Sequence, residues 1–110
     1  MEPIDLAAGD SHGPLFGAAT DDLNLTVLSW PAGHVVPGHV NAERDVVYVV
    51  VAGSAAITVD GTTHVLRRPA ALVVEKGQGR ELRAGPEGVR YVTVHRARGG
   101  LEIGRLAPPG

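Results

Sequence analysis

Residues 39–45, HVNAERD, bring together side chains that are typical of metal sites. His39 and Asn41 are two residues apart, and Asp45 follows within the same short segment. A neutral imidazole and a carboxylate suit divalent Fe, Mn, Ni or Zn, whereas the amide oxygen of Asn41 is a weak ligand for these metals. The segment therefore indicates either a metal site with part of its ligands exchanged or a pocket that works without metal.

The other histidines offer one further candidate ligand. His95 ends the predicted strand YVTVH and shares a face with Tyr91 and Thr93, because side chains two apart in a strand point the same way. If that face looks into the interior, His95 could join His39; the alternative is a histidine at the rim. His64 follows a hairpin turn and is expected to meet solvent. No serine lies in a nucleophile-elbow pattern, so a serine hydrolase is not supported.

The composition is that of one globular domain. The chain has 110 residues, of which 44% are hydrophobic and 20% charged. A formal net charge of -2 with scattered arginines predicts no nucleic-acid partner. The absence of cysteine excludes disulfides, thiol catalysis and cysteine-ligated zinc. The longest apolar stretch, residues 46–57, falls short of the ~20 residues of a membrane helix, and the first residues lack a signal pattern. We therefore expect a cytoplasmic protein without membrane contact.

Short segments rich in Val, Thr, Leu and Ile alternate with Gly- and Pro-containing turns, which is typical of an all-β protein. Asp60-Gly61 is a favoured hairpin pair between two of these segments. The predicted strands are residues 23–30, 46–52, 54–61, 62–68, 70–77, 80–85, 89–96 and 101–106. Residues 1–22 are Gly-rich and weakly patterned, so we expect an N-terminal arm that is mobile or docks on a partner subunit. One barrel domain over residues 23–107 follows it.

The chain resembles a small single-domain cupin over residues 24–96. The first motif of that family runs glycine, five residues, histidine, one residue, histidine, three or four residues, glutamate, six residues, glycine. Its second motif runs glycine, five residues, proline, one residue, glycine, two residues, histidine, three residues, asparagine. In this chain the first motif falls on Gly33, His39, Asn41, Asp45 and Gly53, and the second on Pro69, Glu75, Gly77, Arg80 and Ala84. Seven residues, not six, separate Asp45 from Gly53, which suggests a bulge or a slipped register.

The resemblance implies a double-stranded β-helix, the jelly-roll cupin barrel, in which three histidines and a glutamate bind a divalent metal. Position by position, that ligand set becomes His39, Asn41, Asp45 and Arg80. A guanidinium has no free lone pair and stays protonated. At ~4 Å it would repel a divalent cation by several kcal/mol in a partly buried pocket. The resemblance therefore implies a degenerate metal site with no cofactor favoured; a metal, if present, would be held by His39, Asp45 and Asn41.

A ligand pocket at one end of the barrel is expected, lined by His39, Asn41, Asp45, Arg80, Tyr48 and His95. In the favoured interpretation, Arg80 anchors a small polar or anionic ligand, as guanidinium groups do with carboxylates and phosphates. Two alternatives stay open: a metal-dependent enzyme of isomerase, dioxygenase or lyase type centred on His39, and a structural dimer whose pocket is closed by side chains. An Arg80–Asp45 ion pair would favour the latter. Small cupins commonly pair, so the resemblance also implies a homodimer.

Overall fold

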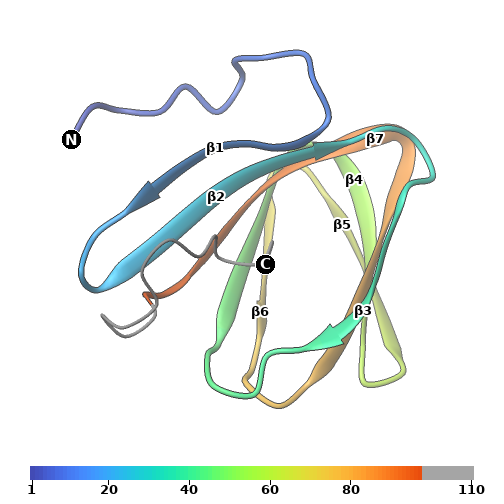
Figure 1. Cartoon of the computed structure of the whole chain (residues 1–110). Helices are drawn as coiled ribbons and strands as arrows, with labels where there is room; N and C mark the ends of the chain where they lie inside the picture. Colours follow the sequence, from blue (N-terminus) through green and yellow to red (C-terminus); the bar gives the residue numbers. More distant parts are fainter. Residues whose placement is uncertain (98–110) are drawn as a thin grey trace.

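The computed structural model describes residues 1–97 of the chain and shows an all-β barrel (Figure 1). Its seven strands are β1 Gly13–Ala19, β2 Leu23–Trp30, β3 Val35–Val40, β4 Val46–Val59, β5 Thr62–Arg67, β6 Ala70–Val74 and β7 Gly79–Arg96. The predicted all-β class is confirmed. The predicted strand at residues 101–106 lies outside the described residues. Within residues 1–97, no helix is long and apolar enough to cross a membrane.

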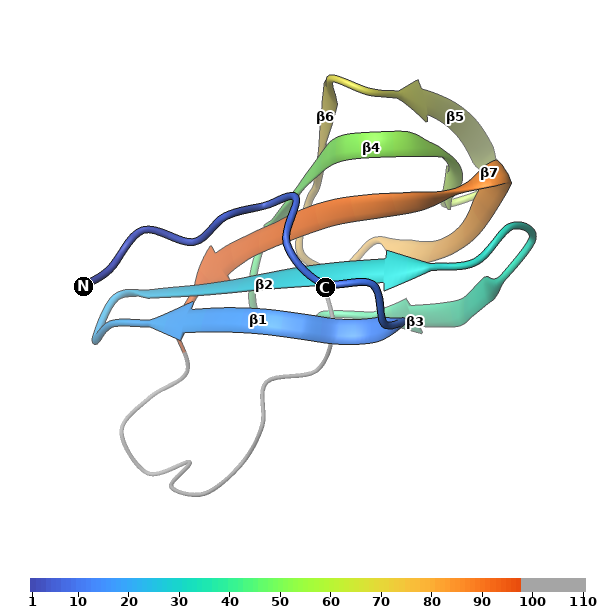
Figure 2. The ribbon, with the colours of Figure 1, turned by 90° about the horizontal axis from the view of Figure 1, so that it is seen from above.

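The two longest strands, β4 and β7, form the frame of the barrel. They pair with each other along most of their length, and the main path of the sheet is β1-β2-β7-β4-β5. β3 pairs with the first part of β7, and β6 pairs with the first part of β4. All pairs are antiparallel. Figure 2 shows how the sheet curls so that β4, β5 and β6 close over the interior.

β4 and β7 bend together where their register slips. The slips lie between Val50 and Ala52 and between Gly53 and Ala55. Gly53 has a φ of 67°, and a Cβ there would collide with the carbonyl oxygen of Gly88. The glycines near residues 53 and 85–88 had suggested chain breaks and hence two strands in each region. That prediction is wrong, because bulges let each strand turn the corner without ending.

The stretch before β2 also differs from expectation. Residues 13–19 form β1, which pairs with β2 of the same chain, so this part of the expected arm is a regular strand of the barrel sheet. Before it, the Arg90 side chain donates hydrogen bonds to the backbone carbonyls of Leu6, Ala8 and Gly9. β3 was likewise not predicted, because Pro37-Gly38 interrupts its pattern. A glycine- and proline-containing segment can still pair at a sheet edge.

The interior is filled by large apolar side chains and two tyrosines. The core residues include Leu28 of β2, Val46, Tyr48, Val50 and Ile57 of β4, Val74 of β6, and Leu82 and Tyr91 of β7. Because β4 and β7 each contribute to both halves of the barrel, their inward residues set the surroundings of any interior site. The predicted hairpin turn at Asp60-Gly61 is confirmed, with φ angles of 45° and 84° at its two residues.

Candidate functional site

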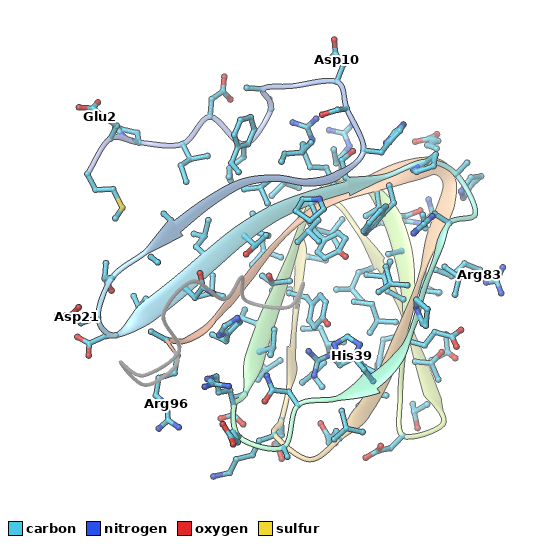
Figure 3. All side chains as sticks on the ribbon, viewed as in Figure 1. Glu2, Asp10, Asp21, His39, Arg83 and Arg96 are labelled. Carbon is cyan, nitrogen blue, oxygen red and sulfur yellow. The ribbon has the colours of Figure 1, made fainter. Side chains whose placement is uncertain are left out.

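Arg80 is a buried cation at the start of β7. Its side chain is only 5% exposed, and it faces His39 across the β3–β7 pair. Its Nε donates a hydrogen bond of 2.9 Å to the hydroxyl oxygen of Tyr48, and its Cζ lies 5.9 Å from the centre of the Tyr48 ring. Figure 3 shows His39 directed from β3 into the space enclosed by the strands, whereas Arg83 points away from the barrel. Arg80 is therefore an inward charge and Arg83 an outward one.

An aromatic chain continues from Tyr48 across the interior. The rings of Tyr48 and Tyr91 are 5.8 Å apart, and Trp30 Nε1 donates a hydrogen bond of 2.9 Å to the Tyr91 hydroxyl. Trp30 in turn stacks on His34, with ring centres 4.1 Å apart. We call the continuous set His39, Arg80, Tyr48, Tyr91, Trp30 and His34 the inner polar row. Trp30, Tyr91 and His34 were not predicted to belong to a site, because isolated aromatic residues usually serve packing.

Three titratable groups of the row, His39, Tyr48 and Tyr91, have pKa values that keep them neutral around Arg80. Burial lowers the pKa of His39 from its ordinary value, and the neighbouring Arg80 lowers it further. Burial raises the pKa of Tyr48, and it raises the pKa of Tyr91 to about 12. At neutral pH the imidazole of His39 and the phenols of Tyr48 and Tyr91 are therefore uncharged. His39 Nδ1 lies 3.4 Å from the carbonyl oxygen of Pro37, and if it donates there, Nε2 remains an acceptor.

Further polar groups of β7 face the same interior. Thr93 lies opposite Tyr48 of β4, and His95 lies opposite Val46. Both are buried, at 1% and 6% exposure. The hydroxyl of Thr93 has no hydrogen-bond partner within residues 1–97, while His95 Nδ1 lies 2.9 Å from the carbonyl oxygen of Arg96. His95 is thus on the inward face together with Tyr91 and Thr93, instead of at an exposed rim.

Asn41 and Asp45, by contrast, are occupied in turns. The Asn41 side-chain oxygen accepts hydrogen bonds from the backbone N–H groups of Glu43 and Arg44, each 3.1 Å long. Asp45 is exposed, and its carboxylate accepts a hydrogen bond of 2.9 Å from the backbone N–H of Lys76. No ion pair joins Asp45 to Arg80 in the described part of the chain. The structure therefore brings His39, Arg80, Tyr48 and His95 to the interior but not the carboxylate of Asp45.

A shallow groove lies elsewhere, where β4, β5 and β7 meet. It has a volume of about 320 Å³, and Arg67, Arg83 and Val65 are among the residues that line it. None of the six residues expected at the pocket contributes to this groove. The inner polar row is the better candidate because its central members Arg80, Tyr48 and Tyr91 are buried and in contact, whereas the two arginines of the groove are exposed.

Comparison with known proteins decides the fold. No protein-family model matches the chain, and no curated protein matches its sequence. Among solved structures, an uncharacterized conserved protein with a double-stranded beta-helix domain from Klebsiella pneumoniae superposes with a TM-score of 0.74 at 18% identity, covering 87% of this chain and 90% of that one. A cupin-2 domain containing protein from Shewanella frigidimarina superposes at 0.69 with 18% identity, covering 81% and 85%. This chain has the cupin fold. KdgF from Halomonas sp. is similar too, at 0.70 with 20% identity and 76% of each chain covered.

Within the cupin barrel, Val46 occupies the place of the motif glutamate. Four residues separate Asn41 from Val46, and six separate Val46 from Gly53, so both spacings of the first cupin motif are satisfied without a slip. Val46 is fully buried and faces inward, whereas Asp45 is exposed. The alignment of Asp45 with the glutamate is therefore wrong by one residue. The motif permits three or four residues between its second histidine and its glutamate. The spacing of three reaches Asp45, the only carboxylate at either position, and the prediction therefore used it.

The cupin metal positions of this chain do not fit a transition metal. They hold His39, an amide already accepting two backbone hydrogen bonds, an aliphatic side chain and a guanidinium. No group of three or more His, Cys, Asp or Glu residues that could hold a metal ion occurs within residues 1–97. His39 alone keeps a nitrogen suited to a metal, and the neighbouring Arg80 opposes any cation placed beside it.

Proposed function

We propose that this cupin barrel binds a small monoanion against Arg80 without a tightly bound metal. The observation that carries the proposal is the burial of Arg80: it is 5% exposed, and no carboxylate of residues 1–97 pairs with it. Buried charges in proteins are normally paired or hydrogen-bonded, because an isolated charge loses much of its solvation. The Tyr48 hydroxyl supplies one such bond, and an anionic ligand would supply the missing counter-charge.

The neighbours of Arg80 favour one negative charge on the ligand. His39, Tyr48 and Tyr91 stay neutral at pH 7, since burial lowers the pKa of the histidine and raises the pKa values of both tyrosines. Arg80 thus contributes a single positive charge to the row. His39 Nε2 and the unpartnered hydroxyl of Thr93 are the polar groups left for orienting a bound molecule. A planar carboxylate or a phosphate suits the guanidinium geometry best.

A binding experiment with a matched pair of arginines tests this proposal. Acetate, benzoate and inorganic phosphate are titrated separately into the untagged full chain and followed by calorimetry and by the fluorescence of Trp30, the one tryptophan. Arg80→Gln should weaken the binding of the best probe by about tenfold or more, as expected for a lost hydrogen bond to a charged group. Arg83→Gln, on the outer side of the same strand, should change it less than about twofold by the same reasoning.

Binding that survives Arg80→Gln, or that falls equally in Arg83→Gln, would contradict an anion site at Arg80. Failure of all three probes to bind would also count against the proposal. Elemental analysis of the same preparations addresses the alternative of a metal-dependent enzyme, which the free Nε2 of His39 would favour. Stoichiometric Fe, Mn, Ni or Zn that is lost in His39→Ala would replace the metal-free proposal with that alternative. A cytoplasmic location stays a prediction.

A further inference from the structure

Arg44, in the turn between β3 and β4, is a second buried guanidinium. Its side chain is only 7% exposed. Val46 and Tyr48 are buried as well, whereas Asp45 is exposed. Because neighbouring residues of an extended segment point to opposite sides, this alternation places Arg44 on the inward side of the sheet, next to Val46. The end of the barrel at which β4 begins therefore holds a cation that is not part of the inner polar row.

Two residues at the altered cupin motif hold the turn that carries Arg44. The side-chain oxygen of Asn41 accepts a hydrogen bond of 3.1 Å from the Arg44 backbone N–H, and its carbonyl oxygen accepts one of 2.8 Å from the Gly77 N–H. On the other side of Arg44, the Asp45 carboxylate accepts a hydrogen bond from the Lys76 backbone N–H. These bonds tie the turn before β4 to the turn before β7, so they fix the backbone on both sides of Arg44.

The inner side of the sheet is polar at this same end. His95 of β7 is paired with Val46, and Thr93 lies two residues farther into the barrel. On the neighbouring strand β2, Asn24 lies opposite His95 and Thr26 lies opposite Thr93. Paired residues share one side of a sheet. The inward side of an antiparallel sheet is normally apolar, so two adjacent polar pairs there suit contact with a polar molecule.

Arg44 and Thr93 each have a hydrogen-bonding atom without a partner. Of the buried side-chain nitrogen and oxygen atoms within residues 1–97, Arg44 Nε and Thr93 Oγ1 are the two that no hydrogen bond reaches. Thr93 is 1% exposed. Buried polar atoms in proteins are normally bonded to the protein, to water or to a ligand, because leaving them unpaired is destabilising. Two such atoms on the inward side of one end of the barrel indicate a place for a polar group.

Arg44 and Arg80 differ in what they still need. Arg44 Nη1 lies 3.6 Å from a carboxylate oxygen of Glu43, whereas no carboxylate in the described part of the chain pairs with Arg80. The Glu43 side chain is 71% exposed, so the pair is solvated, but it supplies a counter-charge. Arg44 therefore needs an acceptor for Nε and not a second negative charge. A hydroxyl group provides that acceptor and can also donate to Thr93 Oγ1.

Tyr48 connects the surroundings of Arg80 with those of Thr93. Its hydroxyl accepts the hydrogen bond from Arg80 Nε, and its backbone lies opposite Thr93 in the β4–β7 pair. A ligand that contacts both residues thus spans about the length of a tyrosine side chain. We propose that the monoanion held by Arg80 is a monocarboxylate with hydroxyl groups along its chain, one of which binds to Arg44 and Thr93. This proposal rests on the proposed function and adds the chemical class of the ligand.

Calorimetric titration of hexanoate and gluconate into the untagged full chain tests the proposal. The two probes share chain length and charge and differ in their hydroxyl groups. Gluconate should bind about tenfold or more tightly than hexanoate, as expected for a hydrogen bond to a charged group. Arg44→Met should weaken gluconate binding by about tenfold and change hexanoate binding by less than about twofold. Arg96→Met is the matched control, because Arg96 is exposed at the same end of β7 and points away from the barrel (Figure 3).

The outcomes separate this proposal from the proposed function. Equal binding of both probes by the wild type, with loss of both in Arg80→Gln, would overturn the hydroxylated ligand and leave the anion site at Arg80 standing. An ordered water that satisfies Arg44 and Thr93 would give this result. Absence of binding by both probes would count against the two proposals together. A preference for gluconate that persists in Arg44→Met, or that is lost equally in Arg96→Met, would contradict the role of Arg44.

Thr93→Val covers the case in which Arg44→Met does not fold. A methyl group in place of an unpartnered buried hydroxyl should leave the unfolding temperature of the ligand-free protein unchanged or higher. The preference for gluconate over hexanoate should nevertheless fall by about threefold or more, because one hydrogen bond to the ligand is lost. An unchanged preference, or a lower unfolding temperature, would show that the Thr93 hydroxyl serves the protein itself and not a ligand.

Discussion

The inner and outer sides of β4 differ in what surrounds them, although both are built from valine. Val46 and Val50 point inward with Tyr48 and are fully buried by the rest of the barrel, while Val47 and Val49 point outward and stay half-exposed. The inner side also holds the hydrogen bond between Tyr48 and Arg80. Alternation along a strand thus separates two tasks: one side places a charge among neutral polar groups, and the other presents a uniform apolar surface.

The largest difference between the two sides should appear when a charge is placed on each. Val46→Lys buries an ammonium group in the barrel interior, where Val46 is fully buried, and should reduce the free energy of unfolding by about 3–5 kcal/mol. Val47→Lys leaves its ammonium at a half-exposed position, so the free energy of unfolding of the monomer should change by less than about 1 kcal/mol. Urea unfolding followed by circular dichroism measures both. Equal losses would show that Val46 and Val47 do not lie in different surroundings.

A companion variant sharpens the placement of Val46 at the motif glutamate. If position 46 is that of the motif glutamate, its side chain lies close to residue 80. A carboxylate at position 46 can then pair with Arg80. Val46→Glu should therefore be less destabilising than Val46→Lys by about 1–3 kcal/mol, in the same urea experiment. Combining Val46→Glu with Arg80→Gln should remove this advantage. An advantage that persists without Arg80 would place Val46 away from it.

The next effect concerns the bond that holds Arg80. Tyr48→Phe keeps the ring but removes the hydroxyl that accepts from Arg80 Nε, leaving a buried guanidinium less well bonded. We expect a loss of about 1.5–3 kcal/mol in the free energy of unfolding. In an Arg80→Met background the same substitution should lose much less, because the charge is gone. A double-mutant cycle by thermal unfolding gives the coupling; two additive effects would mean that the bond contributes nothing.

The sequence predicted the uninterrupted strands of this fold better than the bulges at which long strands bend. β2 was predicted with its observed bounds, because LNLTVLSW contains no breaking residue and is flanked by turns. β4 and β7 were each divided in two, since glycine favours both a chain break and a bulge. Only the close approach of Gly53 to Gly88, which the fold creates, distinguishes these outcomes. β1 was missed because its glycines and alanines carry almost no strand preference of their own.

For the site, the sequence predicted some of the residues that belong to it, but not which way each side chain points. Arg80 was expected inside and is buried there, because its place in the second cupin motif follows from a fixed spacing. Asp45 and Val46 are neighbours, so a spacing uncertain by one residue exchanges the inward and outward side of a strand. The bonds of Tyr91 and Trp30 were beyond prediction for another reason. They join residues 61 positions apart, and no local pattern records such a contact.

A smaller effect should appear in the pH dependence of stability, and it concerns His39. Because the folded-state pKa of His39 is lowered, the unfolded chain binds more protons below about pH 6.5, its unfolded value. The contribution of neutral His39 is therefore present above that pH and is lost as the pH falls toward the folded-state pKa. Urea unfolding between pH 7.5 and pH 5 should show a weaker slope in His39→Asn. An unchanged slope in His39→Asn would show that His39 does not carry this pH dependence.

The smallest effect lies at alkaline pH and concerns the tyrosines of the inner polar row. The chain has two tyrosines, both buried, so folded protein at pH 10 should show little phenolate absorbance, while urea-unfolded protein should show about half of its full signal. The pKa of Tyr91 is raised to about 12, so its contribution to stability is complete below about pH 10 and is lost as the pH rises toward 12. Tyr91→Phe should remove the part of the folded protein's phenolate absorbance that appears only at the highest pH. The ultraviolet titration of wild type and variant measures this directly, and an ordinary tyrosine titration in the folded protein would mean that water reaches the row freely.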